Sequence, residues 1–129
     1  MTKFQTTRSV ALLAIALAVP AYGQGGVDKV DSDTDRLPLH TIIPDYPELA
    51  RRDRIEGNVQ VCFNISRSGN PSRIAVRHST NRLFEKVAKK AVRKSTWQPL
   101  PRDVQLSGIK ACRTFRFSLV PLDEVSDQF

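Results

Sequence analysis

Apolar and polar residues alternate strictly between residues 58 and 65, which predicts a β-strand with one buried face. The turn-forming series Ser68-Gly69-Asn70-Pro71 follows, and a shorter alternation around Ile74 and Val76 predicts the second strand of a hairpin. A last strand is predicted from about Ile109 to Val120, with Arg113 as the one polar residue on its apolar side. The apolar positions of the first and last strands are Val59, Val61, Phe63, Ile65, Ile109, Ala111, Phe115, Phe117 and Leu119.

Between the hairpin and the last strand, apolar residues recur at helical spacing from Phe84 to Val92. Thr80 or Asn81 can cap this helix, and the prolines after Trp97 prevent its continuation. A shorter helix is predicted over residues 47–54, ahead of the first strand. The order of elements predicts an α+β domain, a three-stranded antiparallel sheet packed on one main helix with a short N-terminal helix.

The first 23 residues have the features of a signal peptide. Lys3 and Arg8 precede an unbroken apolar run from Val10 to Val19, and small residues follow where a signal peptidase would cut. Ten apolar residues are short for a bilayer, since a spanning helix needs about 20. We therefore expect a cleaved signal and a periplasmic protein, the alternative being an uncleaved anchor in the inner membrane.

Composition sets the expected boundaries of the folded part. Residues 24–38 are rich in Gly and Asp and nearly free of large apolar side chains, so they are predicted to be a flexible linker. The domain is predicted over residues 39–122, and residues 123–129 form an acidic tail. Without Lys3 and Arg8 the 20 basic residues fall to 18 against 13 acidic ones, a net charge of +5 that favours anionic surfaces.

The two cysteines are predicted to form a disulfide, because an exported protein meets oxidising conditions. Metal binding and a redox pair are the weaker readings, since no ligand spacing or Cys-x-x-Cys motif is present. Cys62 and Cys112 both fall on the polar side of their strands, and a bridge spans only neighbouring strands. The first and last strands should therefore be adjacent, which gives the sheet order second–first–third and leaves the last strand at an edge.

Several motifs occur in one order along most of the domain. Pro44-Asp45-Tyr46-Pro47 is followed by Ile55-Glu56-Gly57, and further matches continue to the last strand. These are Phe63, Gly69-Asn70-Pro71, Phe84, Ala88, Ala91, Trp97, Pro99 and Phe115-Arg116-Phe117. In this series the chain resembles the C-terminal domain of the TonB family.

The resemblance implies an energy transducer that links the inner membrane to outer-membrane transporters. It also implies binding of a short extended transporter segment, the TonB box, by strand addition to the sheet. The receiving edge would be the last strand, with the segment around Tyr46-Pro47 nearby. The implied partner-binding residues are Tyr46, Pro47, Ile109, Ala111, Arg113, Phe115, Arg116 and Phe117. A full transducer has a retained transmembrane helix and a long Pro-rich spacer. The spacer predicted here is short and is not Pro-rich.

Other readings of these residues stay open. Tyr46 could simply pack at the entry to the short helix. Arg113 and Arg116 could protect a sheet edge, and Arg113 could instead mark a bulge. The lysines of the main helix form either an ordinary solvated face or a surface for an anionic envelope polymer. We expect no nucleic-acid partner, no cofactor or metal and no enzyme, because no base-reading, ligand-spacing or catalytic constellation is recognisable.

Overall fold

The computed structural model describes residues 25–119, so the predicted signal peptide (1–23) and acidic tail (123–129) lie outside the described residues. The predicted hairpin is present as β3 (Gly57–Ile65) and β4 (Pro71–Ser79), which pair antiparallel with two irregularities in register. Gly69 makes the turn with a φ of 92°, a backbone conformation that glycine adopts without steric cost.

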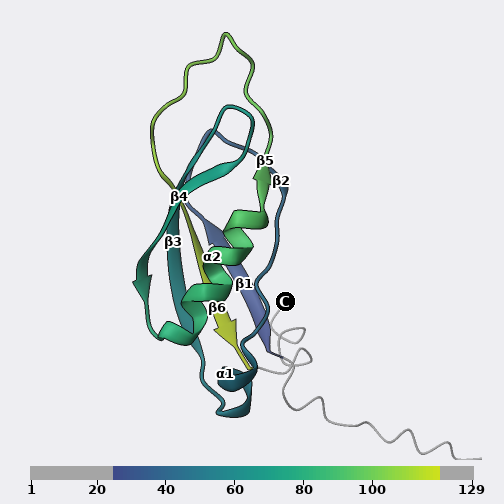
Figure 1. Ribbon diagram of the computed structural model, residues 1–129, viewed down its shortest axis with the longest axis vertical. Helices are drawn as coiled ribbons and strands as arrows, with labels where there is room; N and C mark the ends of the chain where they lie inside the picture. The colour runs from purple at the N-terminus through teal and green to yellow at the C-terminus, as the bar shows by residue number, and fades with distance from the viewer. Residues whose placement is uncertain (1–24, 120–129) are drawn as a thin grey trace, which may run out of the picture.

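The helices follow the predicted spacing. Asn81 caps the helical segment at its start, where its side chain accepts a hydrogen bond from the Leu83 amide at 2.9 Å. A 3₁₀ turn, η1 (Arg82–Phe84), leads into α2 (Glu85–Lys94), which lies over β3 and β4 (Figure 1). The segment expected to form the short N-terminal helix contains α1 (Glu48–Arg52).

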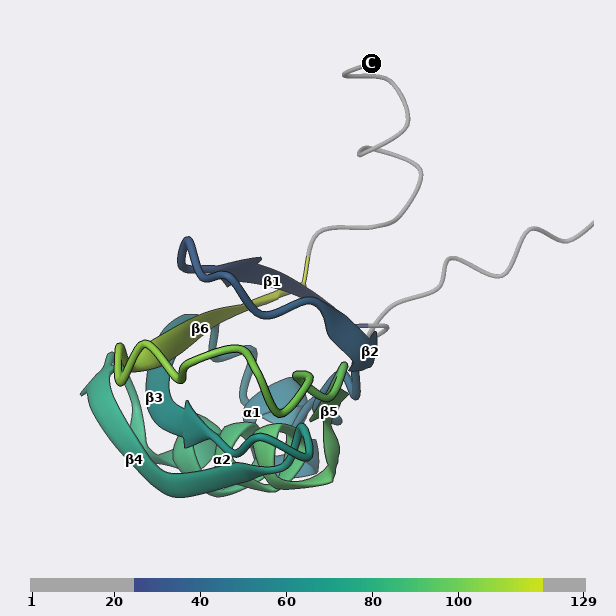
Figure 2. The same cartoon turned by 90° about the horizontal axis from the view of Figure 1, so that it is seen from above.

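Within the described residues the sheet has four strands in the order β1-β6-β3-β4, and all pairings are antiparallel. The predicted order of the three inner strands is correct, because β6 (Ala111–Ser118) pairs with β3 along seven residue pairs. The prediction of a three-stranded sheet is wrong, since β1 (Gly26–Asp31) adds to the outer side of β6. Figure 2 shows the sheet curving around α2, with β1 at the far end of the arc.

Strand β1 also corrects the prediction that residues 24–38 are a flexible linker. Low apolar content does not prevent a strand when a neighbouring sheet edge supplies the hydrogen bonds, and here β6 does so. Beyond β1, buried Arg36 donates hydrogen bonds to the backbone carbonyls of Ile65, Ser66 and Gln98, which fixes the segment to the end of the hairpin. The segment then forms β2 (Pro38–His40), which pairs with β5 (Thr96–Trp97).

The core lies between the sheet and the helices. Tyr46, Phe84 and Phe117 form an aromatic cluster with ring centroids 4.3–5.9 Å apart. Phe63 and Trp97 make a second contact at 5.0 Å. The buried apolar residues are Tyr46, Ala50, Val59, Val61, Phe63, Phe84, Ala88, Ala91, Val92, Trp97, Ala111, Phe115 and Phe117.

The outer face of the sheet carries the predicted disulfide. Cys62 and Cys112 are opposite each other in the β3–β6 ladder, with Cα atoms 4.1 Å apart, and their sulfurs are bonded. No helix of residues 25–119 is both long and apolar enough to cross a membrane.

Candidate functional site

The candidate site is the outer edge of β6, which the sequence predicts to be free. In the structure this edge is paired with β1 from Gly26 opposite Ser118 to Asp31 opposite Arg113. The expectation of an unoccupied last strand is therefore wrong. The edge does accept an extended segment, and that segment comes from the same chain.

The predicted partner-binding residues of β6 are divided between its two faces. Ala111, Arg113, Phe115 and Phe117 face the core and are at most 5% exposed, so their side chains form the floor beneath the strand pair. Arg116 faces outward and is exposed. Ile109 is not in the strand, which starts at Ala111, because the chain turns at Gly108 with a φ of 70° and leaves Ile109 72% exposed.

Arg113 is the only charged residue in the β6 floor. It produces no bulge, since the β3–β6 register runs through it without a shift. Its Nε donates to Asp31 Oδ1 at 2.5 Å and its Nη2 donates to Asp31 Oδ2 at 3.1 Å, so β1 provides a bidentate carboxylate. The guanidinium also lies 5.2 Å from the ring centroid of Trp97.

The Asp31 carboxylate is held in its charged form. Partial burial acts to raise the pKa of Asp31, but the hydrogen bonds from Arg113 and Lys29 and their positive charges outweigh it and lower that pKa. The side chain of Asp31 is 30% exposed, whereas that of Arg113 is fully buried. This ion pair thus links the outermost strand to a charge inside the core.

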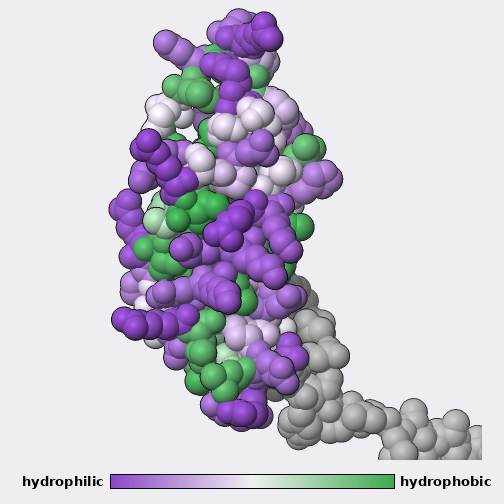
Figure 3. Space-filling view, viewed as in Figure 1, coloured by the Kyte–Doolittle hydropathy of each residue, from purple (hydrophilic) through white to green (hydrophobic). Residues whose placement is uncertain are grey.

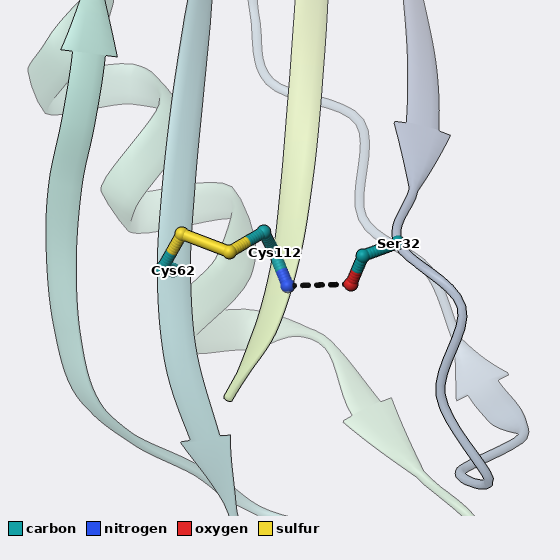
Figure 4. Close-up of a disulfide and its surroundings, with 3 residues drawn as sticks. All are labelled: Ser32, Cys62 and Cys112. Carbon is teal, nitrogen blue, oxygen red and sulfur yellow. Dashed lines mark hydrogen bonds between the residues drawn. A yellow bond between two sulfur atoms is a disulfide. The ribbon is translucent and has the colours of Figure 1, made fainter. Parts of the chain in front are cut away.

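A second attachment of the β1 segment to β6, after the Asp31–Arg113 ion pair, lies at Ser32, directly after β1. The Ser32 hydroxyl accepts a hydrogen bond from the Cys112 amide, and the Ser32 amide donates to the Cys112 carbonyl, each at 2.9 Å. Figure 4 shows Cys112 between its two partners, bonded through sulfur to Cys62 on β3 and through its amide to Ser32. Cys112 therefore connects three neighbouring segments of the sheet.

Tyr46 lies at the other end of the strand pair. It is 6% exposed, and its hydroxyl donates to the Ile55 carbonyl at 2.5 Å. Its ring is covered by Gly25, where an added Cβ would be 2.1 Å from a ring carbon. Burial first, and then the negative charge of Glu56, raises the pKa of Tyr46. Pro47 follows directly as the N-cap residue of α1 and is half-buried.

Sequence reasoning missed the β1 side of the site, namely Gly25, Asp31 and Ser32. One signal was available in Arg113, because a charged residue on an apolar strand face requires a buried counter-charge. The sequence did not identify which of the acidic residues supplies it.

The exposed side of α2 is a second candidate surface. In Figure 3 hydrophilic side chains cover the middle of the face on which α2 lies. A shallow basic groove of about 590 Å³ is lined by Arg82, Glu85, Lys86, Lys89, Lys90, Arg93 and Lys94. In the described part of the chain, no group of three or more His, Cys, Asp or Glu residues could hold a metal ion.

Together, the fold and the β6 edge define a small α+β domain in which a sheet edge takes up an additional strand. The model of the Gram-negative bacterial TonB protein C-terminal family matches residues 43–119, which is more than half of the chain. The chain belongs to this TonB C-terminal family.

Named relatives agree with this assignment. The chain is 30% identical over 89 residues to protein TonB of Pseudomonas aeruginosa, covering 68% of this chain and 26% of that protein. It is 38% identical over 65 residues to protein tonB2 of the same organism, covering 50% of this chain and 24% of that protein. The chain thus spans about a quarter of the length of these curated relatives.

A solved structure shows the same fold. The solution NMR structure of the Pseudomonas aeruginosa TonB CTD superposes with a TM-score of 0.51 at 32% sequence identity. The match covers 69% of this chain and 90% of the other.

Proposed function

We propose that this domain binds extended peptide segments of outer-membrane transporters, the TonB box, by adding them as a strand at β6. In this reading it is a binding module of TonB-like, energy-coupled transport rather than an enzyme, and it works in the periplasm. An uncleaved N-terminal segment would instead hold it at the inner membrane. Family membership supports the partner class.

One observation carries the choice of edge: β6 already pairs with a short extended segment that adds little to the core. Strand addition of this kind draws its affinity from backbone hydrogen bonds and its selectivity from alternate side chains. The floor beneath β6 offers a buried guanidinium at Arg113 and aromatic rings at Phe115 and Phe117. Exposed Arg116 could contact a peptide on the outer face, and Tyr46 and Pro47 border the far end of the edge.

The test is an NMR titration of isotope-labelled, oxidised protein (residues 24–129) with TonB-box peptides from transporters of the same cell. We expect selective shifts along β6 and β1. A nitroxide on the peptide should broaden amides of β6 more strongly than those of β4, the opposite edge. Broadening confined to β4, or no shifts at millimolar peptide, would rule out binding at β6.

A second candidate function is binding of an anionic envelope polymer or surface by α2. Within residues 25–119 the ion pairs are Lys29–Asp31, Arg52–Asp53 and Arg113–Asp31, so the basic side chains of α2 have no carboxylate partner there. Unpaired positive charge on one face favours polyanions in a salt-dependent way.

This candidate is tested by binding to an anionic polysaccharide at increasing salt. Glutamine at four α2 lysines should abolish binding, whereas the same charge change elsewhere on the surface should not. The test variant changes Lys86, Lys89, Lys90 and Lys94, and the control changes Arg73, Arg77, Arg102 and Lys110. Binding that is insensitive to salt, or lost equally in both variants, would contradict the proposal.

A further inference from the structure

We infer that β1 is an internal occupant of the peptide-binding edge that must leave when a ligand strand binds, and that Arg113 makes a carboxylate a requirement of the replacing strand. This inference rests on the proposed function, because it concerns the same β6 edge. It adds a competitor within the chain and a chemical rule for the ligand.

Strand β1 is held less firmly than its neighbours. It pairs with β6 alone, and α2 lies over β3 and β4 on the other side of the sheet. Its six residues bury little apolar surface, since Val27 is half-buried and Val30 is 69% exposed. Segments with few buried apolar contacts are those that open locally without unfolding the domain.

The strongest side-chain interaction between β1 and the rest of the domain is the ion pair of Asp31 with Arg113. If β1 left alone, a fully buried guanidinium would lose its carboxylate, and an unpaired buried charge is strongly unfavourable. A replacing strand therefore has to bring its own carboxylate to the level of Arg113. Four residues away on the same face, at the level of Phe117, β1 carries Val27, so an apolar residue fits there.

The disulfide keeps the acceptor in place during such an exchange. Cys112 is bonded to Cys62, so β6 stays attached to β3 when the hydrogen bonds on its other side are broken. On the outer face, the Ser32 hydroxyl holds the end of β1 through its hydrogen bond from the Cys112 amide, and this bond can break without affecting the disulfide. The ligand class is an extended segment with an acidic residue and, four positions away, an apolar one.

The first experiment locks β1 onto β6 in the full mature chain. Val30 and Thr114 are opposite each other on the outer face of the sheet, so V30C/T114C can form a disulfide across the strand pair. V30S/T114S is the matched control without the lock. We expect TonB-box peptides to bind the serine variant and to bind the locked variant at least about tenfold more weakly.

The second experiment tests the carboxylate rule with peptides copying residues 25–32. One peptide keeps the aspartate that corresponds to Asp31, and the other carries asparagine there. Both are titrated into D31N, whose own β1 lacks the carboxylate. The aspartate peptide should bind at least about tenfold more tightly, because it alone restores the pair with Arg113. Equal affinities would overturn the rule.

The outcomes separate this inference from the proposed function. If transporter peptides bind the locked and serine variants equally, β1 is not displaced, and the peptides bind at an edge other than that of β6. If transporter peptides bind neither variant, the proposed function fails. The peptides that copy residues 25–32 then show by themselves whether β1 can be replaced by another strand. Binding of the aspartate copy to D31N, but not to the locked chain, supports exchange, and no binding of the copy to D31N refutes it.

Discussion

Replacing Asp31 with asparagine tests whether the ion pair with Arg113 holds the outermost strand. The substitution leaves a fully buried guanidinium without its bidentate acceptor. Removing one partner of a buried ion pair costs about 3–5 kcal/mol. The side chain of Asp31 is 30% exposed, and Arg113 keeps its contacts with Ser95 and Trp97, so we expect a smaller loss of about 2–3 kcal/mol.

The loss of unfolding free energy in D31N also has an upper limit, because β1 is the outermost strand of the sheet. Once the cost of the unpaired charge exceeds the free energy that holds β1, the strand detaches and water reaches Arg113 through the open edge. The effect should therefore appear first as local opening. Hydrogen exchange of β1 and β6 amides should accelerate by a larger factor than exchange on the β3–β4 side.

The matched control is D28N, which makes the same charge change on the exposed face of the same strand. Urea unfolding should place D28N within about 0.5 kcal/mol of the parent chain. Equal unfolding free energies for the two variants, with equal exchange rates on β1 and β6, would refute the argument that this pair secures the strand.

The pH dependence provides an independent check. Because the pKa of Asp31 is lowered in the folded protein, its stabilising contribution is fully present above the ordinary value of 3.8. The contribution is lost as the pH falls below 3.8 through the folded pKa. The stability difference between the parent chain and D31N should therefore shrink in acid, and a constant difference down to pH 2 would contradict this assignment.

Three further predictions concern the framework around the site. Replacing Cys62 and Cys112 with serine should lower the unfolding free energy by about 4 kcal/mol, since the bridge closes a separation of 50 residues; calorimetry measures it, and an unchanged Tm would contradict it. Gly69→Ala should cost at least about 2 kcal/mol in urea unfolding, because φ is positive and the new Cβ would meet the Trp97 carbonyl; a neutral result would mean that the turn can rearrange. Tyr46→Phe should cost about 1–2 kcal/mol by removing a buried hydrogen bond, and it should remove the stability loss that the raised tyrosine pKa predicts as the pH increases beyond 10.0; an alkaline loss equal to that of the parent chain would show that another group titrates.

The sequence determined the parts of this protein that depend on local pattern. Strict alternation predicted β3, helical spacing and Asn81 predicted the main helix, and the shared polar parity of Cys62 and Cys112 predicted that β3 and β6 are neighbours. In each case the side chains on one face of a strand or helix recur at the period of that element, so a short stretch of sequence is enough to identify the face. The motif series identified the family for the same reason, since it records core and turn positions in order.

Only the tertiary structure decided what lies at the edge of the sheet. Strand β1 has one half-buried valine and no strong periodicity, so nothing local distinguishes it from a linker. It becomes a strand because β6 offers unpaired backbone groups and because Arg113 requires a carboxylate. The paired residues of β1 and β6 are 82 to 92 positions apart in sequence. Backbone pairing is independent of side-chain identity, so the sequence predicts an available edge but does not reveal which segment fills it.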